Sequence, residues 1–377
     1  MDFLFNESQR IFQKTMRDFC EKEVRPVIEK LDREHLFPYE IYDKLVEMGL
    51  PGIIYPEEYG GLGLDLMTLV LAFEELSRLS LGLAMAQGWV LYAPPVYYCG
   101  NEEQKRRYLV PVIKGEKKGC FALTEPNAGS DVASLATTAK KGTDGYIVNG
   151  SKIFITNADV SDYMVLAART GSMKDGHRGI SLFVIDSHSK GITINRLAKI
   201  GAGTASTCEI GFQDVHIPFE NLMGEENRGF YPLMEKLDSF RVLFGVGGLG
   251  VAQGAYEEAL QYARERVQFG KPIGKFQAIQ FMLSDMYTQI EAVRLLIYRA
   301  TWMIDQGMRA TKEASAAKLM AAEVAMNTVV NGMQIFGGYG YMEEFPIQRY
   351  YREAKLVAIG EGTSEIQRSI IAKQLGL

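Results

Sequence analysis

The chain contains 377 residues, of which 47% are hydrophobic, and it carries a formal net charge of −5 at pH 7. That length exceeds a single ordinary hydrophobic core and favours two or three domains with shared interfaces. Acidic and basic residues are mixed along the chain, and no apolar stretch approaches the roughly 18 residues of a membrane helix. The composition therefore argues against a nucleic-acid-binding face, a basic membrane patch and a membrane-spanning protein.

Residues 5–118 show the periodicity of amphipathic helices. Phe12, Met16 and Phe19, for example, fall on one helical face. We expect several helices here, separated by the proline and glycine pairs at 51–52, 60–61 and 94–95. The N-terminus enters the first helix at once and has no signal-peptide or transit-peptide features. A cytoplasmic protein of a prokaryote and a processed organellar protein are the two options, and the presence of Met1 favours the first, which is the expectation here.

Residues 119–222 instead predict short strands and turns. The apolar runs 146–148 and 152–155 flank Asn149-Gly150, a pair typical of a type I′ hairpin. Further short strands are expected at 163–168, 180–185, 192–194 and 208–212. Together they predict a compact antiparallel sheet or barrel.

The helical period returns near residue 226 and lasts to the end of the sequence. Long segments at roughly 228–267, 276–306 and 312–336, joined by short connections, predict an antiparallel bundle. The sequence therefore indicates an α+β protein with an N-terminal α-helical domain, a central β-barrel or β-sheet domain and a C-terminal four-helix bundle. The expected domains are 1–118, 119–225 and 226–377.

A glycine-rich stretch at 245–250 matches the GxGxxG pattern of dinucleotide-binding folds, and Glu265 lies 20 residues after Gly245. That fold requires a hydrophobic strand leading into the glycines. Here the preceding residues, 235–241, are polar and helical. We therefore expect these small residues to let one bundle helix approach another helix or a ligand closely.

Cysteines and histidines suggest neither disulfides nor a metal site. Cys20, Cys99, Cys120 and Cys208 are widely separated and lack CxxC spacing, as expected for reduced, buried residues of a cytosolic protein. The four histidines show no ligand spacing, so we expect neither metal catalysis nor a histidine-based triad.

Glu361 is the candidate catalytic residue. It lies in IGEGTSEIQR, residues 359–368, between Gly360 and Gly362, whose backbone can bend tightly and approach a ligand. The following residues resume a helical pattern, so the motif predicts a loop leading into a helix. Such a loop can project a carboxylate into a cavity, where loss of water raises its pKa toward that of a general base. On its own, the motif also fits an exposed loop glutamate.

The Glu361 motif is the last of several strings that follow one another along the chain. The others are PEEYGGLG at 56–63, FALTEPNAGSD at 121–131, KIFITNA at 152–158, DVHIPFENLMGEENRGF at 214–230, ARERVQFGKPIGKFQ at 263–277 and QIFGGYGYMEEFPIQRYYREAK at 334–355. By their order and spacing, the chain resembles the acyl-CoA dehydrogenase family from about Asp2 to Leu377. The resemblance implies an FAD-dependent enzyme that desaturates an acyl-CoA thioester: a base removes the α-proton while the β-hydrogen leaves as hydride to N5 of FAD.

Glu361 matches the family's base, whose backbone N–H, with a flavin ribityl hydroxyl, binds the thioester carbonyl. Some members instead place the base just before an arginine on the bundle helix. That position is Phe240 here, and phenylalanine cannot accept a proton. Arg241 matches an arginine lining the acyl pocket, although a surface salt bridge is an alternative. Asp238 matches an acid that contacts pantetheine, and Gly360 and Gly362, on either side of the base, are expected to contact the substrate.

The resemblance places the isoalloxazine ring in the central domain. Thr124 and Thr156 match threonines that hydrogen-bond the ring, and Phe154 stands where many members have a tryptophan over the ring face. Ser130 matches a serine near the FAD phosphates or CoA. The same strings imply cofactor contacts from Phe121, Leu123, Gly129 and Ile155. Threonines in strands are otherwise simply good strand formers.

The C-terminal strings imply a homotetramer, built as a dimer of dimers. In the family, equivalent residues reach the adenosine and pyrophosphate of a neighbouring subunit's FAD; here they are Arg266, Phe269, Gln277, Gln334, Gly337 and Gly338. Arginine suits pyrophosphate through paired donors, and glycines let backbone N–H groups approach it. Thr363 and Glu365, just after the base, are also expected near the cofactor.

The expected electron acceptor is an electron-transfer flavoprotein. An acyl-CoA oxidase is the first alternative, since it would use the same base but pass electrons to oxygen. A related flavoprotein acting on nitroalkanes would be expected to have aspartate at position 361. A non-catalytic, DNA-associated relative would be expected to carry a basic C-terminal extension, against the acidic net charge here.

Gly360 bears on the acyl group. Many straight-chain enzymes have tyrosine at this position, whereas members acting on branched acyl groups can have glycine. Extra volume beside the reacting carbons, and hence a branched, cyclic or aryl-bearing acyl group, is therefore an option. Members that bind dicarboxylic chains place an arginine in the helix around 80–90, and SLGLAMAQGWV has none.

Overall fold

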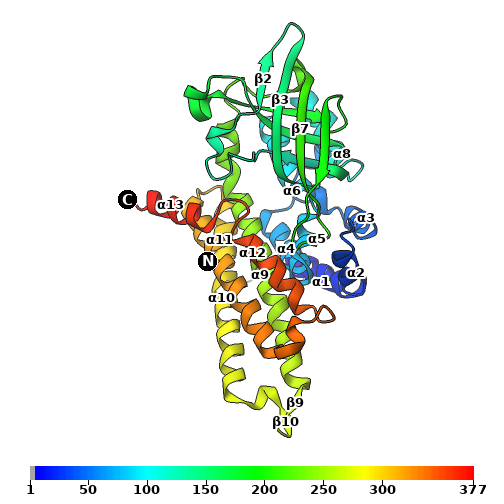
Figure 1. The fold of residues 1–377 in the computed structure, drawn as a ribbon, viewed down its shortest axis with the longest axis vertical. Coiled ribbons are helices and arrows are strands. Elements are labelled where there is room, and N and C mark those ends of the chain that lie inside the picture. Colours follow the sequence, from blue (N-terminus) through cyan, green and yellow to red (C-terminus); the bar gives the residue numbers. More distant parts are fainter. Residues whose placement is uncertain (1–4) are drawn as a thin grey trace.

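The computed structural model describes residues 5–377, with the side chains of 230–237 excepted. A sheet forms one end of the elongated molecule, and three long C-terminal helices run to the other end (Figure 1). The N-terminal helices pack beside the upper part of the long helices and below the sheet (Figure 1). The order helix, sheet, helix agrees with the α+β fold expected from the sequence.

The N-terminal helices are α1 (Glu7–Phe19), α2 (Ile28–Arg33), α3 (Tyr39–Glu47), α4 (Leu66–Leu79), α5 (Leu81–Met85), α6 (Trp89–Cys99), α7 (Glu102–Gln104) and α8 (Val110–Ile113). The predicted apolar face of α1 is confirmed: Met16 is fully buried, and Phe12 and Phe19 pack against the same core. Every residue of α4 is buried, so α4 is the central helix of this domain.

The expected helix break at Pro94-Pro95 is wrong, because both prolines lie inside α6. Proline has a fixed φ close to the helical value, and its main cost is the loss of an N–H donor. Ala93, Pro95 and Val96 are buried, so packing holds this segment helical despite the missing hydrogen bonds.

The sheet consists of β1 (Gly119–Ala122), β2 (Thr138–Lys141), β3 (Gly145–Thr156), β4 (Tyr163–Arg169), β5 (Ile180–Asp186), β6 (Ile192–Arg196), β7 (Thr207–Pro218) and β8 (Leu222–Met223). Its strand order is β6-β7-β3-β2-β4-β5-β8, and β1 pairs in parallel with β4. Most other pairs are antiparallel, as expected. The strands bury a core of their own, in which Val148, Leu166 and Phe183 are fully inaccessible.

The hairpin predicted at Asn149-Gly150 is wrong. Both residues lie inside β3, where the register against β7 shifts between Val148 and Gly150. The Asn149 amide is paired instead with Asp214: it donates to Oδ1 over 2.9 Å and accepts from the backbone N–H over 2.9 Å. The sequence signal therefore marks a bulge. The hairpin instead connects β2 to β3, earlier in the chain. There the Gly142 N–H donates to the Gly145 carbonyl over 2.7 Å.

The C-terminal helices are α9 (Phe230–Glu265), α10 (Gln277–Asp305), α11 (Thr311–Phe336), α12 (Ile347–Val357) and α13 (Ser364–Gln374). A hairpin of β9 (Val267–Gln268) and β10 (Lys271–Pro272) connects α9 to α10. Helices α9 to α12 pack together as a bundle, and α13 packs on α11. The three long helices match the predicted segments closely.

Close helix packing explains the glycine-rich stretch at 245–250, which is part of α9. A methyl group on Gly250 would lie 2.5 Å from Cβ of Ser77, and one on Gly254 would lie 2.1 Å from the Arg78 carbonyl oxygen. Both contacts are with α4, and both are too short for a side chain. The expectation of close approach between helices is therefore confirmed.

Buried polar contacts connect the N-terminal helices to the C-terminal bundle. Arg78 of α4 is 1% exposed and pairs with Glu75 over 2.9 Å and with Glu257 of α9 over 3.0 Å. Glu353 of α12 caps α5 by accepting from the Ser80 hydroxyl over 2.7 Å and the Leu81 N–H over 2.9 Å. The bundle is thus fixed relative to the N-terminal helices.

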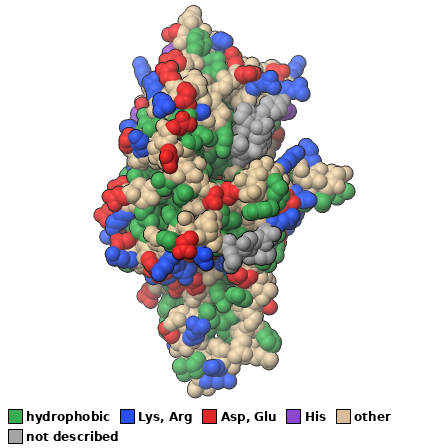
Figure 2. Space-filling model, turned by 180° about the vertical axis from the view of Figure 1, so that it is seen from behind, with side chains coloured by type: hydrophobic (Ala, Val, Ile, Leu, Met, Phe, Trp, Pro, Cys, Tyr) green, Lys and Arg blue, Asp and Glu red, His purple; other side chains and the backbone are tan. Residues whose placement is uncertain are grey.

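Acidic and basic side chains are interspersed over the face shown in Figure 2. Within residues 5–377, no helix combines the length and hydropathy needed to cross a membrane. Among the side chains that the structure describes, no group of three or more His, Cys, Asp or Glu could hold a metal ion. The domain boundaries at 118/119 and 225/226 stay predictions.

Candidate active site

The loop between α12 and α13 carries Glu361. Glu361 and Gly362 have φ values of 50° and 85°, so two successive residues are left-handed. This is ordinary for glycine but uncommon for glutamate. The loop then enters α13, where the Thr363 side chain accepts from the Ile366 N–H over 3.3 Å as an N-cap. The predicted sequence of loop and helix is confirmed.

Burial raises the pKa of the Glu361 carboxyl above its ordinary value. The positive charges of Lys318 and Arg241 act against this shift by favouring the ionised form. The residue as a whole is partly accessible, but its carboxyl group is surrounded by protein. An exposed loop glutamate, the alternative left open by the motif alone, does not fit this environment.

Asp238 and Arg241 lie one helical turn apart on α9. Arg241 donates to Oδ1 of Asp238 over 2.8 Å, and the Thr311 hydroxyl donates to Oδ2 over 2.8 Å. The salt bridge considered from the sequence therefore exists, but it is not a surface pair, because the two side chains are only 11% and 16% exposed. Burial lowers the pKa of Arg241, while Asp238 and Glu361 oppose that shift.

Two residues that hold this loop are missing from the site residues expected from the sequence: Lys318 lies outside the quoted strings, and Gln367 lies within the Glu361 string without an assigned role. Lys318 of α11 is fully buried and donates to the Gly362 carbonyl over 2.6 Å. Gln367 of α13, which is also buried, donates to the carbonyls of Glu361 (3.1 Å) and Gly362 (3.0 Å). A lysine within the apolar run AAKLMAA is the available clue, since a buried cation needs a partner.

The two strings expected to hold a flavin ring lie side by side. The Ile153 N–H donates to the Thr124 carbonyl over 2.9 Å. Buried Lys152 donates to the Leu123 carbonyl (2.8 Å) and to Glu125 (2.7 Å), whose other contacts are the N–H groups of residues 136 and 137. Burial lowers the pKa of Lys152 to about 8. The ion pair between Lys152 and Glu125 joins the segment after β1 to β3. It therefore brings together the two strings that contain Thr124 and Thr156.

Phe154 has a strained and exposed conformation. Its φ is 59°, which is an outlier for a bulky residue, and its side chain is 64% exposed. It lies where the β3–β7 register shifts between Lys152 and Ile155. An aromatic ring held out of the sheet at such a cost suits a flat ligand above it. The buried Asn157 Oδ1 close by lacks a hydrogen-bond partner among the described residues.

The other central-domain candidates differ in accessibility. Phe121, Leu123, Thr124 and Thr156 are partly buried, whereas Gly129 and Ser130 are exposed. Ile155 is 3% exposed and belongs to the sheet core, so only its backbone could contact a ligand.

The residues expected to serve a neighbouring subunit gather at the other end of the molecule. The Arg266 guanidinium lies 5.4 Å from the centre of the Tyr339 ring, which joins the end of α9 to the glycine loop after α11. Phe269, at the tip of the β9–β10 turn, is 93% exposed. Accessible residues with them are Gln277, Gln334, Gly337 and Gly338. Figure 1 shows the β9–β10 tip at the end opposite to the sheet, so one chain does not bring the two sets together.

Comparison with known proteins gives the same order of domains. Family models described as the N-terminal, middle and C-terminal domains of acyl-CoA dehydrogenase match residues 6–116, 120–215 and 227–376. A short-chain-specific acyl-CoA dehydrogenase of Clostridium acetobutylicum is 41% identical over 378 residues, covering 100% of both chains. The chain belongs to the acyl-CoA dehydrogenase family.

Two further relatives extend the comparison. The solved structure of butyryl-CoA dehydrogenase from Megasphaera elsdenii has a TM-score of 0.97 and 41% identity, covering 100% of both chains. The caffeyl-CoA reductase–Etf complex subunit CarC of Acetobacterium woodii is 43% identical, covering 98% of this chain and 99% of its own. The protein is thus a flavoprotein oxidoreductase that performs acyl-CoA dehydrogenation, as the sequence resemblance implied.

Within this enzyme, the space at Gly360 is occupied. A methyl group on Gly360 would lie 2.6 Å from Cζ of Phe244, whose side chain comes from α9. The glycine therefore admits the ring of Phe244. The interpretation that Gly360 leaves free volume beside the reacting carbons is therefore corrected. An aromatic ring from another helix fills the place that a tyrosine side chain at position 360 would take.

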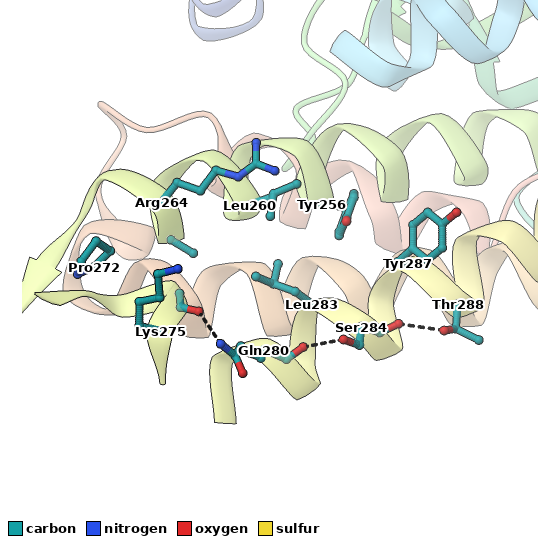
Figure 3. A pocket seen from close by; sticks show the side chains of 12 residues that line it. Tyr256, Leu260, Arg264, Pro272, Lys275, Gln280, Leu283, Ser284, Tyr287 and Thr288 are labelled. Atoms are coloured by element: carbon teal, nitrogen blue, oxygen red, sulfur yellow. Dashed lines mark hydrogen bonds between the residues drawn. The ribbon is translucent and has the colours of Figure 1, made fainter. Parts of the chain in front are cut away.

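Neither of the two cavities described is lined by the predicted site residues. A groove of about 570 Å³ runs between α9 and α10 near the β9–β10 end, with Tyr256, Leu283 and Tyr287 among its lining residues (Figure 3). A second cavity of about 260 Å³ lies between α4, α6 and α9, and Phe240 lines it next to Arg241. Phe240, which lines this second cavity, directly precedes Arg241 in the chain.

Gly360→Tyr tests the role of Phe244. Because the new ring would overlap Phe244, we expect about ten- to a hundredfold lower kcat/KM with linear and bulky acyl-CoA substrates alike, in line with roughly 1–3 kcal/mol for overpacking. Gly360→Tyr/Phe244→Ala should recover most of the activity with the linear substrate. Steady-state assays with a ferrocenium acceptor measure both. A Gly360→Tyr variant that loses only the bulky substrate would show that Phe244 moves aside and leaves the space to the acyl group.

Proposed function

We propose that Glu361 is the base that removes the α-proton of the acyl-CoA thioester. The observation that carries this proposal is the carboxyl group itself: burial strengthens its affinity for a proton, while Lys318 and Arg241 favour its ionised form. An ionised carboxylate with a raised pKa is what α-proton removal requires. Phe240, at the alternative position for the base, has no ionisable group.

The thioester carbonyl would be held by the backbone of the same loop. Among the described residues, nothing accepts a hydrogen bond from the Glu361 N–H. A donor in this position can stabilise the negative charge that develops on the carbonyl oxygen as the proton leaves. Arg241, and Asp238 paired with it, would line the path of the acyl and pantetheine groups, and exposed Ser130 would contact CoA or the cofactor phosphates.

FAD is the flavin that we propose for the central domain, and when bound it accepts the β-hydrogen as hydride. Thr124 and Thr156 would hydrogen-bond the ring, and Phe154 would cover one of its faces. The support is the hydrogen bond that aligns the two strings and the exposed, strained position of Phe154. Backbone groups of Leu123 and Ile155 would complete this part of the site, with Phe121 and Gly129 nearby.

Glu361→Gln tests the base directly. The amide has nearly the same shape but cannot accept the α-proton, so we expect folding, flavin content and acyl-CoA binding to persist while flavin reduction slows by at least about a hundredfold. Stopped-flow absorbance of the flavin after mixing with acyl-CoA measures this step. Glu103→Gln, the same change at an exposed site, is the control. Flavin reduction at the wild-type rate in Glu361→Gln would show that another group is the base.

Electrons are proposed to pass to an electron-transfer flavoprotein, as the name of the Acetobacterium relative suggests. We expect the acyl-CoA-reduced enzyme to be reoxidised rapidly by such a protein and slowly by air. Absorbance of the flavin and a peroxide assay during turnover measure the two routes. Rapid, stoichiometric peroxide formation would instead identify the enzyme as an acyl-CoA oxidase.

We propose a homotetramer, a dimer of dimers, in which the far end of each bundle completes a neighbour's cofactor site. Arg266, Phe269, Gln277 and the loop with Gly337 and Gly338 are accessible there, and all suit a pyrophosphate or an adenosine. The exposed face of α10 supports this, because apolar side chains recur along it at Phe281, Leu295 and Trp302, which are 59%, 48% and 41% exposed. Thr363 and Glu365, at the start of α13, would lie near the cofactor as well.

Arg266→Ala should weaken FAD retention, because the cation proposed for the neighbour's pyrophosphate is lost. We expect a lower ratio of flavin to protein after gel filtration, followed by dissociation of the tetramer. Absorbance and light scattering measure both quantities. Arg10→Ala, at an exposed arginine of α1, is the matched control. A monomer with full flavin content would contradict the proposed assembly.

The acyl group is proposed to be branched, cyclic or aryl-bearing. The Acetobacterium relative is named for caffeyl-CoA, whose acyl group carries an aromatic ring. The second cavity supports such a group, because Tyr55, Trp89, Tyr97 and Phe240 give it an aromatic lining. The substrate panel used for the Gly360 variants tests this choice, since a preference for short linear thioesters would contradict it.

A further inference from the structure

Lys318 is a buried titratable residue that takes no direct part in the proposed proton transfer. It lies about two turns into α11, and its side chain is fully inaccessible. A methyl group on Gly245 of α9 would lie 3.3 Å from Cα of Lys318, so the two helices are close at this level. From there the side chain reaches the Glu361 loop, where Nζ donates to the Gly362 carbonyl over 2.6 Å.

The backbone that Lys318 holds is the strained part of the loop. A non-glycine residue in the left-handed region is strained and persists where its surroundings fix it. Gln367 fixes the Glu361 and Gly362 carbonyls from α13, and Lys318 fixes the second of them from α11. Because each peptide group is planar, holding a carbonyl also sets the direction of the next N–H. The orientation of the loop thus depends on both side chains.

Charged groups face this pair from every helix around it. Lys318 is near Glu361 in the loop, Glu365 on α13 and Arg241 on α9, and its Nζ lies 5.7 Å from the centre of the Phe244 ring. Both Lys318 and Arg241 lower the pKa of Glu361, and the effect of Lys318 is the larger of the two. Arg241 is already paired with Asp238, which leaves Lys318 as the cation without a salt bridge of its own among the described residues.

We propose that Lys318 is a positioning residue for the catalytic loop, whose ammonium group holds the Gly362 carbonyl and provides the main counter-charge that keeps Glu361 ionised. This inference rests on the proposed role of Glu361 as the base. Burial lowers the pKa of Lys318 to about 8, and Glu361 and Glu365 oppose that shift. Since this value lies above neutral pH, the side chain is still largely charged under ordinary assay conditions.

Lys318→Met and Lys318→Gln separate charge from simple support. Both remove the positive charge, and the glutamine keeps an N–H donor for the Gly362 carbonyl. Without the cation, the pKa of Glu361 rises further, so the carboxyl stays protonated to a higher pH. In both variants, the midpoint of the increase in flavin-reduction rate with pH should therefore shift upward by about one pH unit. At the acidic end of the profile, the rate should be about tenfold lower than in the wild type. Lys318→Arg should keep the wild-type midpoint.

The measurement uses the flavin-bound enzyme, mixed in a stopped-flow instrument with the acyl-CoA that reduces it fastest. Lys199→Met is the matched control. The Lys199 ammonium also donates to a backbone carbonyl, that of Ala205, and to the Thr207 hydroxyl over 3.1 Å, and burial lowers its pKa to about 8 as well. Because Lys199 supports the central sheet rather than the Glu361 loop, its loss should lower thermal stability and leave the midpoint of the pH profile unchanged.

The outcomes distinguish this inference from the proposed function. A wild-type midpoint in folded Lys318→Gln, together with loss of flavin reduction in Glu361→Gln, would overturn the role of Lys318 and leave Glu361 as the base. Full flavin reduction in Glu361→Gln would overturn the base itself. If Lys318→Met does not fold, the midpoints of Lys318→Gln and Lys318→Arg still decide the question, since the former must shift and the latter must not.

Discussion

The close approach of α9 to its neighbours is the constraint on which the rest of the enzyme depends. Methyl groups on Gly245 and Gly248 would lie 3.3 Å from Cα of Lys318 and 3.1 Å from the Ala321 carbonyl oxygen, both on α11. On its other side, α9 meets α4 through Gly250 and Gly254. The helix that carries Arg241 and Phe244 is therefore fixed from two sides, and the Glu361 loop is built against it. A side chain at Gly250 or Gly254 would push α9 away from α4, because a methyl group there already comes within 2.5 Å and 2.1 Å of α4 atoms.

Burial and paired charge act together at the site. A carboxylate in water is a weak base, and a buried carboxylate without a counter-charge takes up a proton and loses its function. Glu361 avoids both limits, because burial raises its pKa while cations from two helices favour ionisation. Lys152 and Glu125 use the same principle for a structural purpose, since their buried contact joins the two strings of the central domain.

Much of this organisation could be predicted from the sequence, and the failures share a physical cause. The long helices were predictable because their periodicity is local, and so was the loop that enters α13 at Thr363. Asn149-Gly150 and Pro94-Pro95 gave the wrong local structure, because pairing with β7 and burial in α6 overrode the preferences of the residues. Lys318 could not be assigned from the sequence, since its partner lies 44 residues away along the chain. Local patterns predict elements, whereas the contacts between elements decide what a buried charge does.

Gly360 shows the same limit at the level of substrate choice. A glycine beside the base suggests space, but the space belongs to whichever neighbour the fold brings there, and that neighbour is Phe244 from α9. The aromatic surface that a tyrosine would supply from the loop is thus supplied from the bundle helix. The surroundings of Gly360 are consequently set jointly by α9 and the Glu361 loop. The second cavity is lined in part by Phe240, the residue that precedes Arg241. An effect of residue 360 on substrate preference should therefore depend on residue 244 as well, and not on position 360 alone.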